Sequence, residues 1–181
     1  MRQLLLLRHA KSSWDDPSLP DHARPLNPRG RRAAAAMAQA IRDLGLSPDV
    51  VLVSSARRTL QTLEQVRPAF DPGTLVEPMD ALYLASWQAL LALLREAPET
   101  ARSVMVIGHN PGLHDLAMAL TGAAAQAAGN ADAQRLAEGY PTAALAEFSI
   151  ALPWRLLEPG GARLVRFLMP RDLAAAGEVP A

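Results

Sequence analysis

The sequence predicts an α/β fold with a mainly parallel central sheet. Short apolar runs alternate with longer segments of helical periodicity through about two thirds of the chain. Two of these runs, 49–55 and 102–110, show little polar alternation, as expected for strands that are covered on both faces. Helices on both faces of such a sheet give three layers, α/β/α.

Four strands are expected in this alternating part of the chain. The first covers Gln3 to Leu7, and the second and fourth are the apolar runs 49–55 and 102–110. A weaker pattern predicts the third strand near 74–77.

The segments between these strands carry helical signals. Asn27 can cap a helix that has Pro28 at its first position, and Ser86 can cap another. Helices are expected over 28–45, 56–70, 86–97 and 111–120.

The C-terminal part breaks the alternation. Segments 144–152 and 162–170 read as two strands of the same sheet, at least one of them antiparallel at an edge. Between them and the fourth strand, the Ala- and Gly-rich segment 122–139 is compatible with a flexible loop or with an extra helix over 132–138.

Composition limits the possible functions. The chain has 181 residues, 50% of them hydrophobic, which predicts one soluble domain over 1–181. Its 18 basic and 18 acidic residues cancel, so no global positive field is available to bind nucleic acid or an anionic membrane. The absence of cysteine excludes a disulfide framework, a thiolate metal site and a cysteine nucleophile. No segment reaches the roughly 20 apolar residues of a membrane span, and the apolar N-terminal run is too short for a signal peptide, so a cytoplasmic protein is expected.

Basic and imidazole side chains follow three of the predicted strands. Arg8 and His9 come after the first strand, Arg57 and Arg58 after the second, and His109 with Asn110 after the fourth. In open parallel sheets, ligands bind outside the carboxyl ends of the strands. Each motif alone could belong to an ordinary surface loop, but together they predict one site.

Two arginines, two histidines and nearby helix starts suit a tetrahedral phosphate. Guanidinium groups bind its oxygens bidentately, and helix N-termini add backbone donors. Neighbouring arginines disfavour the protonated form of an imidazole, so one histidine can stay neutral and act as a nucleophile.

Three motifs then show a resemblance to a known family. "LLLRHA" near the start, "SSARRTLQT" at 54–62 and "GHNPGL" at 108–113 closely resemble the histidine phosphatase superfamily, whose fold is phosphoglycerate mutase-like. The further stretches "RPLNPRG" at 24–30, "YPTAAL" from Tyr140 and "FLMPRDL" near the end resemble its SixA-type branch, which is associated with dephosphorylating phosphohistidine in signalling proteins.

The resemblance implies roles for individual residues. His9 is similar to the family's phosphate-accepting histidine and Arg8 to its partner arginine. The family's second arginine corresponds to Arg58, four residues before Thr62, ahead of Arg57. His109 is similar to the second histidine, and it is expected to bind phosphate together with Arg8, Arg58 and Asn110. The superfamily motif has glycine where this chain has Ala10, a replacement familiar in the SixA-like branch.

The activity implied is hydrolysis of phosphohistidine on signalling proteins, through a phosphohistidine on the enzyme. Two alternatives stay open: a small-molecule phosphomonoesterase, in which Glu77 or Asp80 acts as general acid, and a noncatalytic phosphate-binding protein. A positioned acid contributes about 10²–10⁴ in rate to ester hydrolysis, whereas the imidazole leaving group of a phosphoramidate needs less help. The partner is therefore a phosphohistidine-bearing protein or a small phosphorylated substrate.

Neither a cofactor nor a metal is expected. His114 lies five residues after His109, whereas two ligands on one helical face are usually four apart. His22 is expected to be solvated, and Trp14, Trp87 and Trp154 are interpreted as packing residues.

Overall fold

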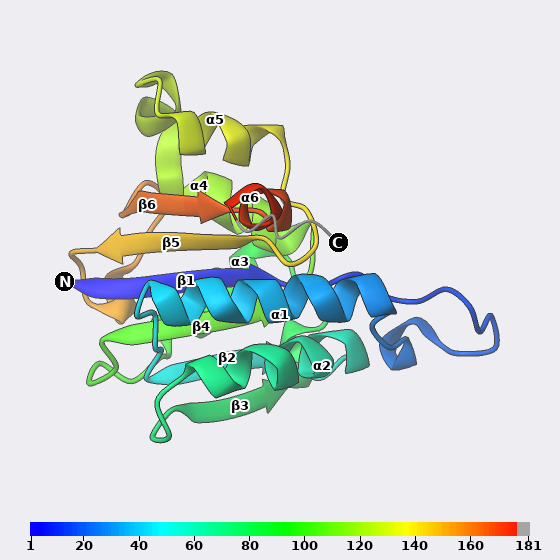
Figure 1. The fold of residues 1–181 in the computed structure, drawn as a ribbon. Helices are drawn as coiled ribbons and strands as arrows, with labels where there is room; N and C mark the ends of the chain where they lie inside the picture. The colour runs from blue at the N-terminus through cyan, green and yellow to red at the C-terminus, as the bar shows by residue number, and fades with distance from the viewer. Residues whose placement is uncertain (177–181) are drawn as a thin grey trace.

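A computed structural model describes residues 1–176, which form a six-stranded sheet with helices on both faces (Figure 1). The strands stand in the order β3-β2-β4-β1-β5-β6. Their bounds are Arg2–Arg8 for β1, Val50–Ser54 for β2, Leu75–Met79 for β3, Ser103–Gly108 for β4, Leu145–Ile150 for β5 and Ala162–Leu168 for β6. Residues 177–181 of the expected domain lie outside the described part.

The first four strands are parallel, so their carboxyl ends meet at one edge of the sheet. Arg8 of β1 lies opposite Gly108 of β4, and the residues that follow each strand therefore begin at the same level. The buried runs Leu4–Leu7 and Val104–Ile107 explain this pairing, because strands covered on both faces contain few polar side chains.

Within residues 1–176, six helices pack around the sheet. Their bounds are Pro28–Asp43 for α1, Arg57–Val66 for α2, Trp87–Arg95 for α3, Gly112–Ala127 for α4, Ala131–Glu138 for α5 and Pro170–Ala176 for α6. Met37 of α1 and Leu63 of α2 pack with Leu5 and other side chains of one sheet face. Leu94 of α3 and Leu116 of α4 belong to the larger core on the opposite face. The expected three layers are therefore present.

The predicted helix starts are confirmed by their caps. The Asn27 side chain accepts a hydrogen bond from the Gly30 amide, and Ser86 accepts one from Ala89. The sequence did not predict α6, because the apolar pattern of the last expected strand, 162–170, runs on to Pro170, where this helix begins.

Both C-terminal strands join the sheet as antiparallel neighbours, as predicted. β5 pairs antiparallel with β1, and β6 pairs antiparallel with β5 at the sheet edge. The weak third strand is also present, but it runs to Met79, so Glu77 lies within the strand.

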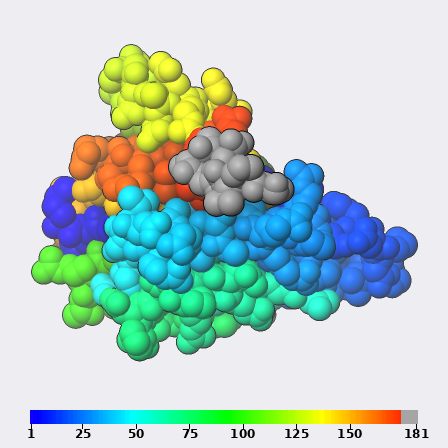
Figure 2. Space-filling model, viewed as in Figure 1, coloured from blue at the N-terminus to red at the C-terminus, as the bar shows by residue number. Residues whose placement is uncertain are grey.

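The segment 122–139 is mostly helical, and the flexible-loop alternative is wrong. α4 continues to Ala127 across a break at Gly122, whose φ of 72° favours glycine. Asn130 caps α5, close to the predicted 132–138 helix. In the space-filling view, the α4–α5 region projects at the top and the connection between β1 and α1 projects at the right (Figure 2). Within residues 1–176, no helix has the length and hydrophobicity of a membrane span.

Candidate active site

The residues that follow β1, β2 and β4 meet in one cavity of about 330 Å³ at the carboxyl edge of the sheet. The rings of His9 and His109 lie 5.3 Å apart between their centroids. The cavity is lined by Arg8, His9, Lys11, Ser12, Trp14, Arg24, Arg58, Leu84, His109, Asn110 and Thr142. The structure thus brings together the predicted Arg8, His9, Arg58, His109 and Asn110.

His9 is held in one tautomer by the backbone carbonyl of the next residue, Ala10. Its side chain is buried, and Nδ1 lies 2.7 Å from the Ala10 carbonyl oxygen. A carbonyl can only accept, so the hydrogen is on Nδ1 and Nε2 carries the lone pair. Burial lowers the pKa of His9 to about 4, and the cations Arg58 and Arg8 add to this effect. The imidazole is therefore neutral at pH 7, as the sequence predicted, although burial contributes more than the arginines do.

His109 is also buried and neutral. Its Nε2 lies 2.7 Å from the Ser54 hydroxyl, which accepts a hydrogen bond from the Ala56 amide. The Ser54 hydroxyl hydrogen can be donated to Nε2, and this arrangement puts the ring hydrogen on Nδ1, a buried atom without a partner among the described residues. Burial, with smaller contributions from His9 and Arg58, lowers the pKa of His109 to about 3.

Arg58 and Arg57 occupy different environments at the start of α2. Arg58 is 4% exposed and lines the cavity, whereas Arg57 is exposed and does not. The Thr62 hydroxyl donates to the Arg58 carbonyl and accepts from the Ala10 amide, at 2.8 and 3.0 Å. This bridge joins α2 to the loop after His9.

Asp21 orients the guanidinium of Arg58. Its carboxylate accepts from Arg58 Nη2 at 3.0 Å and from Arg24 Nη1 at 2.9 Å, and its backbone carbonyl accepts from Arg58 Nη1 at 2.8 Å. The Tyr83 hydroxyl donates to the same carboxylate. Chiefly through the Tyr83 hydrogen bond, and also through the arginines, the pKa of Asp21 falls to about 2, so this carboxyl is ionised at pH 7.

Arg24 is a third arginine of the cavity that the sequence analysis did not assign. It lies in the "RPLNPRG" stretch, is buried, and donates from Nε to the Ser13 carbonyl at 3.0 Å. Its guanidinium carbon lies 3.2 Å from the centroid of the Trp14 ring. In the sequence, Arg24 is marked only by its place in a stretch that resembles the family, because it does not directly follow a predicted strand.

Arg8 and Asn110 share a backbone partner. Arg8 Nη1 and Asn110 Nδ2 each donate to the Tyr140 carbonyl at 2.9 Å, while the Tyr140 hydroxyl donates to the Leu6 carbonyl. Buried Arg8 Nε and Asn110 Oδ1 have no hydrogen-bond partner among the described residues. The "YPTAAL" stretch thus supports two cavity side chains.

The two candidate acids lie away from the cavity lining. Glu77 is exposed on β3, and Asp80 is exposed in the short helical turn Asp80–Leu82. Neither is among the lining residues.

The other residues singled out in the sequence fall into two groups. Trp154 is buried, with Nε1 donating to the Ala101 carbonyl, and Trp87 is partly buried against the core, as predicted. The packing interpretation is wrong for Trp14, which is 76% exposed and lines the cavity, because Arg24 rather than the core supports its ring.

The remaining histidines have structural partners. His22 is exposed and lies 3.0 Å from the Ser55 hydroxyl, and His114 Nε2 donates to the Leu136 carbonyl. Over residues 1–176, no three His, Asp or Glu side chains are grouped in a way that could hold a metal ion.

The fold and the cavity define an α/β protein with a cavity lined by arginines and histidines at the carboxyl edge of its sheet, and comparisons identify its family. The model of the histidine phosphatase superfamily (branch 1) matches residues 4–83. The crystal structure of SixA from Agrobacterium tumefaciens, a proposed phosphohistidine phosphatase, has a TM-score of 0.78 and 32% identity, covering 93% of this chain and 98% of that one. The structure of SixA from Nakamurella multipartitia, also a proposed phosphohistidine phosphatase, has a TM-score of 0.81 and 30% identity. The match covers 93% of this chain and 96% of that one. The chain therefore belongs to the histidine phosphatase superfamily, in its SixA-type branch, and has the phosphoglycerate mutase-like fold.

Sequence relatives extend over most of the chain. An uncharacterized Mycobacterium tuberculosis protein is 35% identical over 166 residues, which are 91% of this chain and 100% of that protein. An uncharacterized chloroplastic protein of Arabidopsis thaliana is 36% identical over 134 residues, 67% of this chain but only 60% of the plant protein.

Proposed function

We propose that the chain is a phosphohistidine phosphatase that acts on phosphorylated signalling proteins, with His9 as the nucleophile. Membership of the superfamily supports phosphatase activity on a phosphorylated substrate. The observation that carries the proposed chemistry is the His9 ring, which is neutral and bonded through Nδ1, so that Nε2 has the lone pair.

In the first step, His9 Nε2 attacks phosphorus in line. The bond from phosphorus to Nε2 forms while the bond from phosphorus to the substrate imidazole breaks, and the departing nitrogen takes a proton from water. In the second step, water attacks the phosphorus on His9, and the bond from phosphorus to Nε2 breaks. The protons of the water leave with inorganic phosphate, and the electron pair of the broken bond returns to Nε2, which restores the neutral ring. Arg8, Arg58, His109 Nδ1 and Asn110 bind the phosphoryl oxygens during both transfers.

The choice of an N–P bond rests on the carboxyl groups near the cavity. Protonation of an alkoxide leaving group requires a protonated acid close to the substrate. Glu77 and Asp80 are exposed and outside the lining, while Asp21, with a pKa of about 2, is ionised and held by arginines. These residues therefore suit a substrate whose leaving group is an imidazole better than one whose leaving group is an alkoxide.

A trapping experiment tests the nucleophile. Protein mixed with a ³²P-labelled phosphohistidine protein and quenched in alkaline denaturant should carry label that is lost on mild acid treatment. The label should disappear in His9→Ala and persist in Arg57→Ala, a matched substitution of an exposed side chain. Labelling and turnover that survive in His9→Ala would show the mechanism to be wrong.

A substrate panel tests the leaving group. We expect kcat/KM for a phosphohistidine-bearing protein to exceed that for common phosphomonoesters by at least tenfold, about 1.4 kcal/mol of transition-state preference. Chelators should leave the rate unchanged. A sugar phosphate or nucleotide that is turned over tenfold better would contradict the proposed substrate and leave the phosphatase assignment intact.

A further inference from the structure

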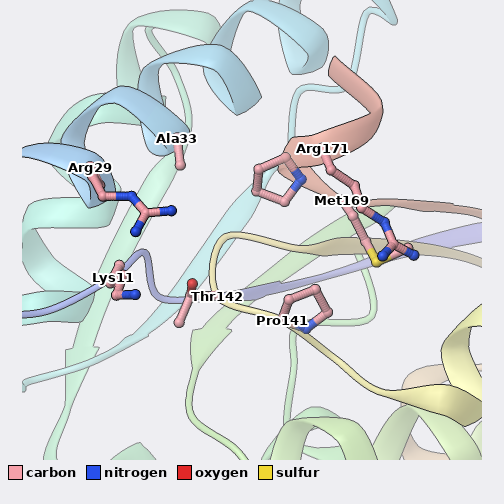
Figure 3. Close-up of a pocket in the computed structure, with 8 residues that line it drawn as sticks. Lys11, Arg29, Ala33, Pro141, Thr142, Met169 and Arg171 are labelled. Carbon is pink, nitrogen blue, oxygen red and sulfur yellow. The ribbon is translucent and has the colours of Figure 1, made fainter. Parts of the chain in front are cut away.

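A second pocket, of about 260 Å³, lies beside the catalytic cavity and carries three cations (Figure 3). Lys11 and Thr142 line both, so the two pockets are neighbours. Arg29 comes from the first turn of α1, and Arg171 from the first turn of α6 on the other side of the pocket (Figure 3). The remaining lining residues are Ala33, Pro141, Met169 and Pro170.

These three cations lack ion-pair partners in the described part of the chain. Among residues 1–176, no acidic side chain lines the pocket, and the salt bridges do not include Lys11, Arg29 or Arg171. Nearby Arg135 shows the contrast, because it is paired with both Asp132 and Asp172. The pocket is therefore a local positive surface on a chain whose formal net charge is zero.

Helix stability does not explain the placement of the two arginines. Arg29 and Arg171 are each the second residue of their helix, where a cation is close to the positive end of the helix dipole. Both side chains are exposed, so they are not required to fill the core. Their position is unfavourable for the helices and favourable for an external anion.

We infer that this pocket binds acidic side chains of the protein that carries the phosphohistidine, next to the phosphorylated residue. The inference rests on the proposed function and extends it to the part of the partner that surrounds the reacting group. Because Lys11 and Thr142 line both pockets, these contacts would lie beside the proposed phosphoryl site and not on a remote face.

The lining fits carboxylate side chains on a protein better than a second phosphate of a small substrate. In the catalytic cavity, Arg58 and His109 are buried and preorganised by hydrogen bonds, as a tightly held phosphoryl group requires. In the second pocket, all three cations are exposed, and the apolar lining includes exposed Pro141 and the partly buried Ala33 and Pro170. The methylene groups of Glu side chains can cover that apolar surface while their carboxylates reach the cations.

The experiment uses two phosphohistidine peptides that differ only in their flanking residues, glutamate in one and glutamine in the other. Arg29→Glu/Arg171→Glu reverses the pocket charge without altering a residue of the catalytic cavity. Arg102→Glu/Arg163→Glu is the matched control, because both arginines are exposed and line a pocket near the amino ends of the strands. O-phosphoserine, a small ester with its own carboxylate, is included as a substrate.

For the parent and the control, we expect kcat/KM to be higher for the glutamate peptide, with the preference weakening as salt is added. The pocket variant should lose about tenfold in kcat/KM on the glutamate peptide, because it loses two exposed charge pairs, each of which is weak by itself. Its rates on the glutamine peptide and on O-phosphoserine should stay unchanged.

Equal kcat/KM for the two peptides in the parent, or a preference that survives in the pocket variant, would overturn the inference while leaving the phosphatase proposal in place. A loss on O-phosphoserine equal to that on the glutamate peptide would assign the pocket to small substrates, and it would also overturn the inference.

If the proposed function is wrong, the result is different, because neither peptide is then turned over. Binding of the fluorescent unphosphorylated glutamate peptide is therefore measured separately. Binding that is weakened only in Arg29→Glu/Arg171→Glu supports the acidic docking site without reference to turnover. Equal binding by all three proteins counts against it.

Discussion

The two neutral histidines of the cavity predict a steep loss of folding stability as the pH falls from about 7.5 to about 5. An unperturbed histidine has a pKa of about 6.5, whereas the folded chain lowers the pKa to about 4 for His9 and about 3 for His109. Between these values, the unfolded chain binds protons that the folded chain excludes. The free energy of unfolding therefore falls as the pH falls through this range.

The size of the effect follows from the width of the pH range. Below the unfolded pKa, each pH unit costs about 1.4 kcal/mol per histidine while the folded imidazole stays neutral. From about pH 7.5 to about pH 5 the loss is about 2 kcal/mol per ring and about 4 kcal/mol for the two together. The low pKa of Asp21, about 2 in the folded chain, adds its own loss only at lower pH, as the carboxyl of the unfolded chain begins to protonate near pH 4.

Urea unfolding at a series of pH values measures this loss. His9→Asn and His109→Asn should each remove about half of the pH dependence, because each removes one imidazole that is charged only in the unfolded chain. His22→Asn is the matched control, since that side chain is exposed in the folded protein. A pH dependence that stays at the parent value in both cavity variants would refute the reasoning from buried, neutral rings.

Three further substitutions test the cavity and its support. Arg58→Ala should lower kcat/KM by about 10³-fold or more, within the range known for arginines that stabilise a transferring phosphoryl group, whereas Arg57→Ala should change it little; equal losses would mean that the wrong arginine was assigned. Asp21→Asn should reduce kcat by about 10–100-fold while the protein remains folded by circular dichroism, because Arg58 loses its charged partner; an unchanged kcat would exclude a positioning role. Gly30→Ala should destabilise the fold by about 1–3 kcal/mol in urea unfolding, since its Cβ would lie 2.1 Å from the Lys11 carbonyl oxygen; an unchanged midpoint would show that the two segments can separate at little cost.

The parallel part of the sheet and the residues at its ends could be predicted from the sequence, because both depend on local signals. Buried strands have few polar residues, and the first polar residue after such a strand marks the functional edge. This reasoning placed Arg8, His9 and His109 together, and the structure puts them in one cavity because Arg8 lies opposite Gly108. The geometry also separates Arg58 from Arg57 by burial, a distinction that the sequence drew only through the family resemblance.

The residues that the sequence missed depend on contacts between distant loops. Arg24 reaches the cavity because the loop after β1 folds back, with the Arg24 side chain bonded to the carbonyl of Ser13 and the hydroxyl of Ser12. Asp21 contacts Arg58 although the two residues are 37 positions apart in the sequence, and no periodic pattern predicts a contact between them. Trp14 was misread for the same reason, because an aromatic residue in a loop carries no local sign that an arginine rather than the core supports it.

The arrangement of charge connects phosphate binding and activation of the nucleophile in the proposed mechanism. Arg8, Arg24 and Arg58 line the cavity, and Asp21 contacts the last two. The remaining positive charge favours a phosphoryl dianion, and each of the three arginines also lowers the pKa of His9. In the proposed mechanism, the same cations would hold the phosphoryl oxygens and help burial to keep the His9 ring neutral. Because His9 is neutral before a substrate binds, that mechanism requires no separate group to deprotonate the nucleophile.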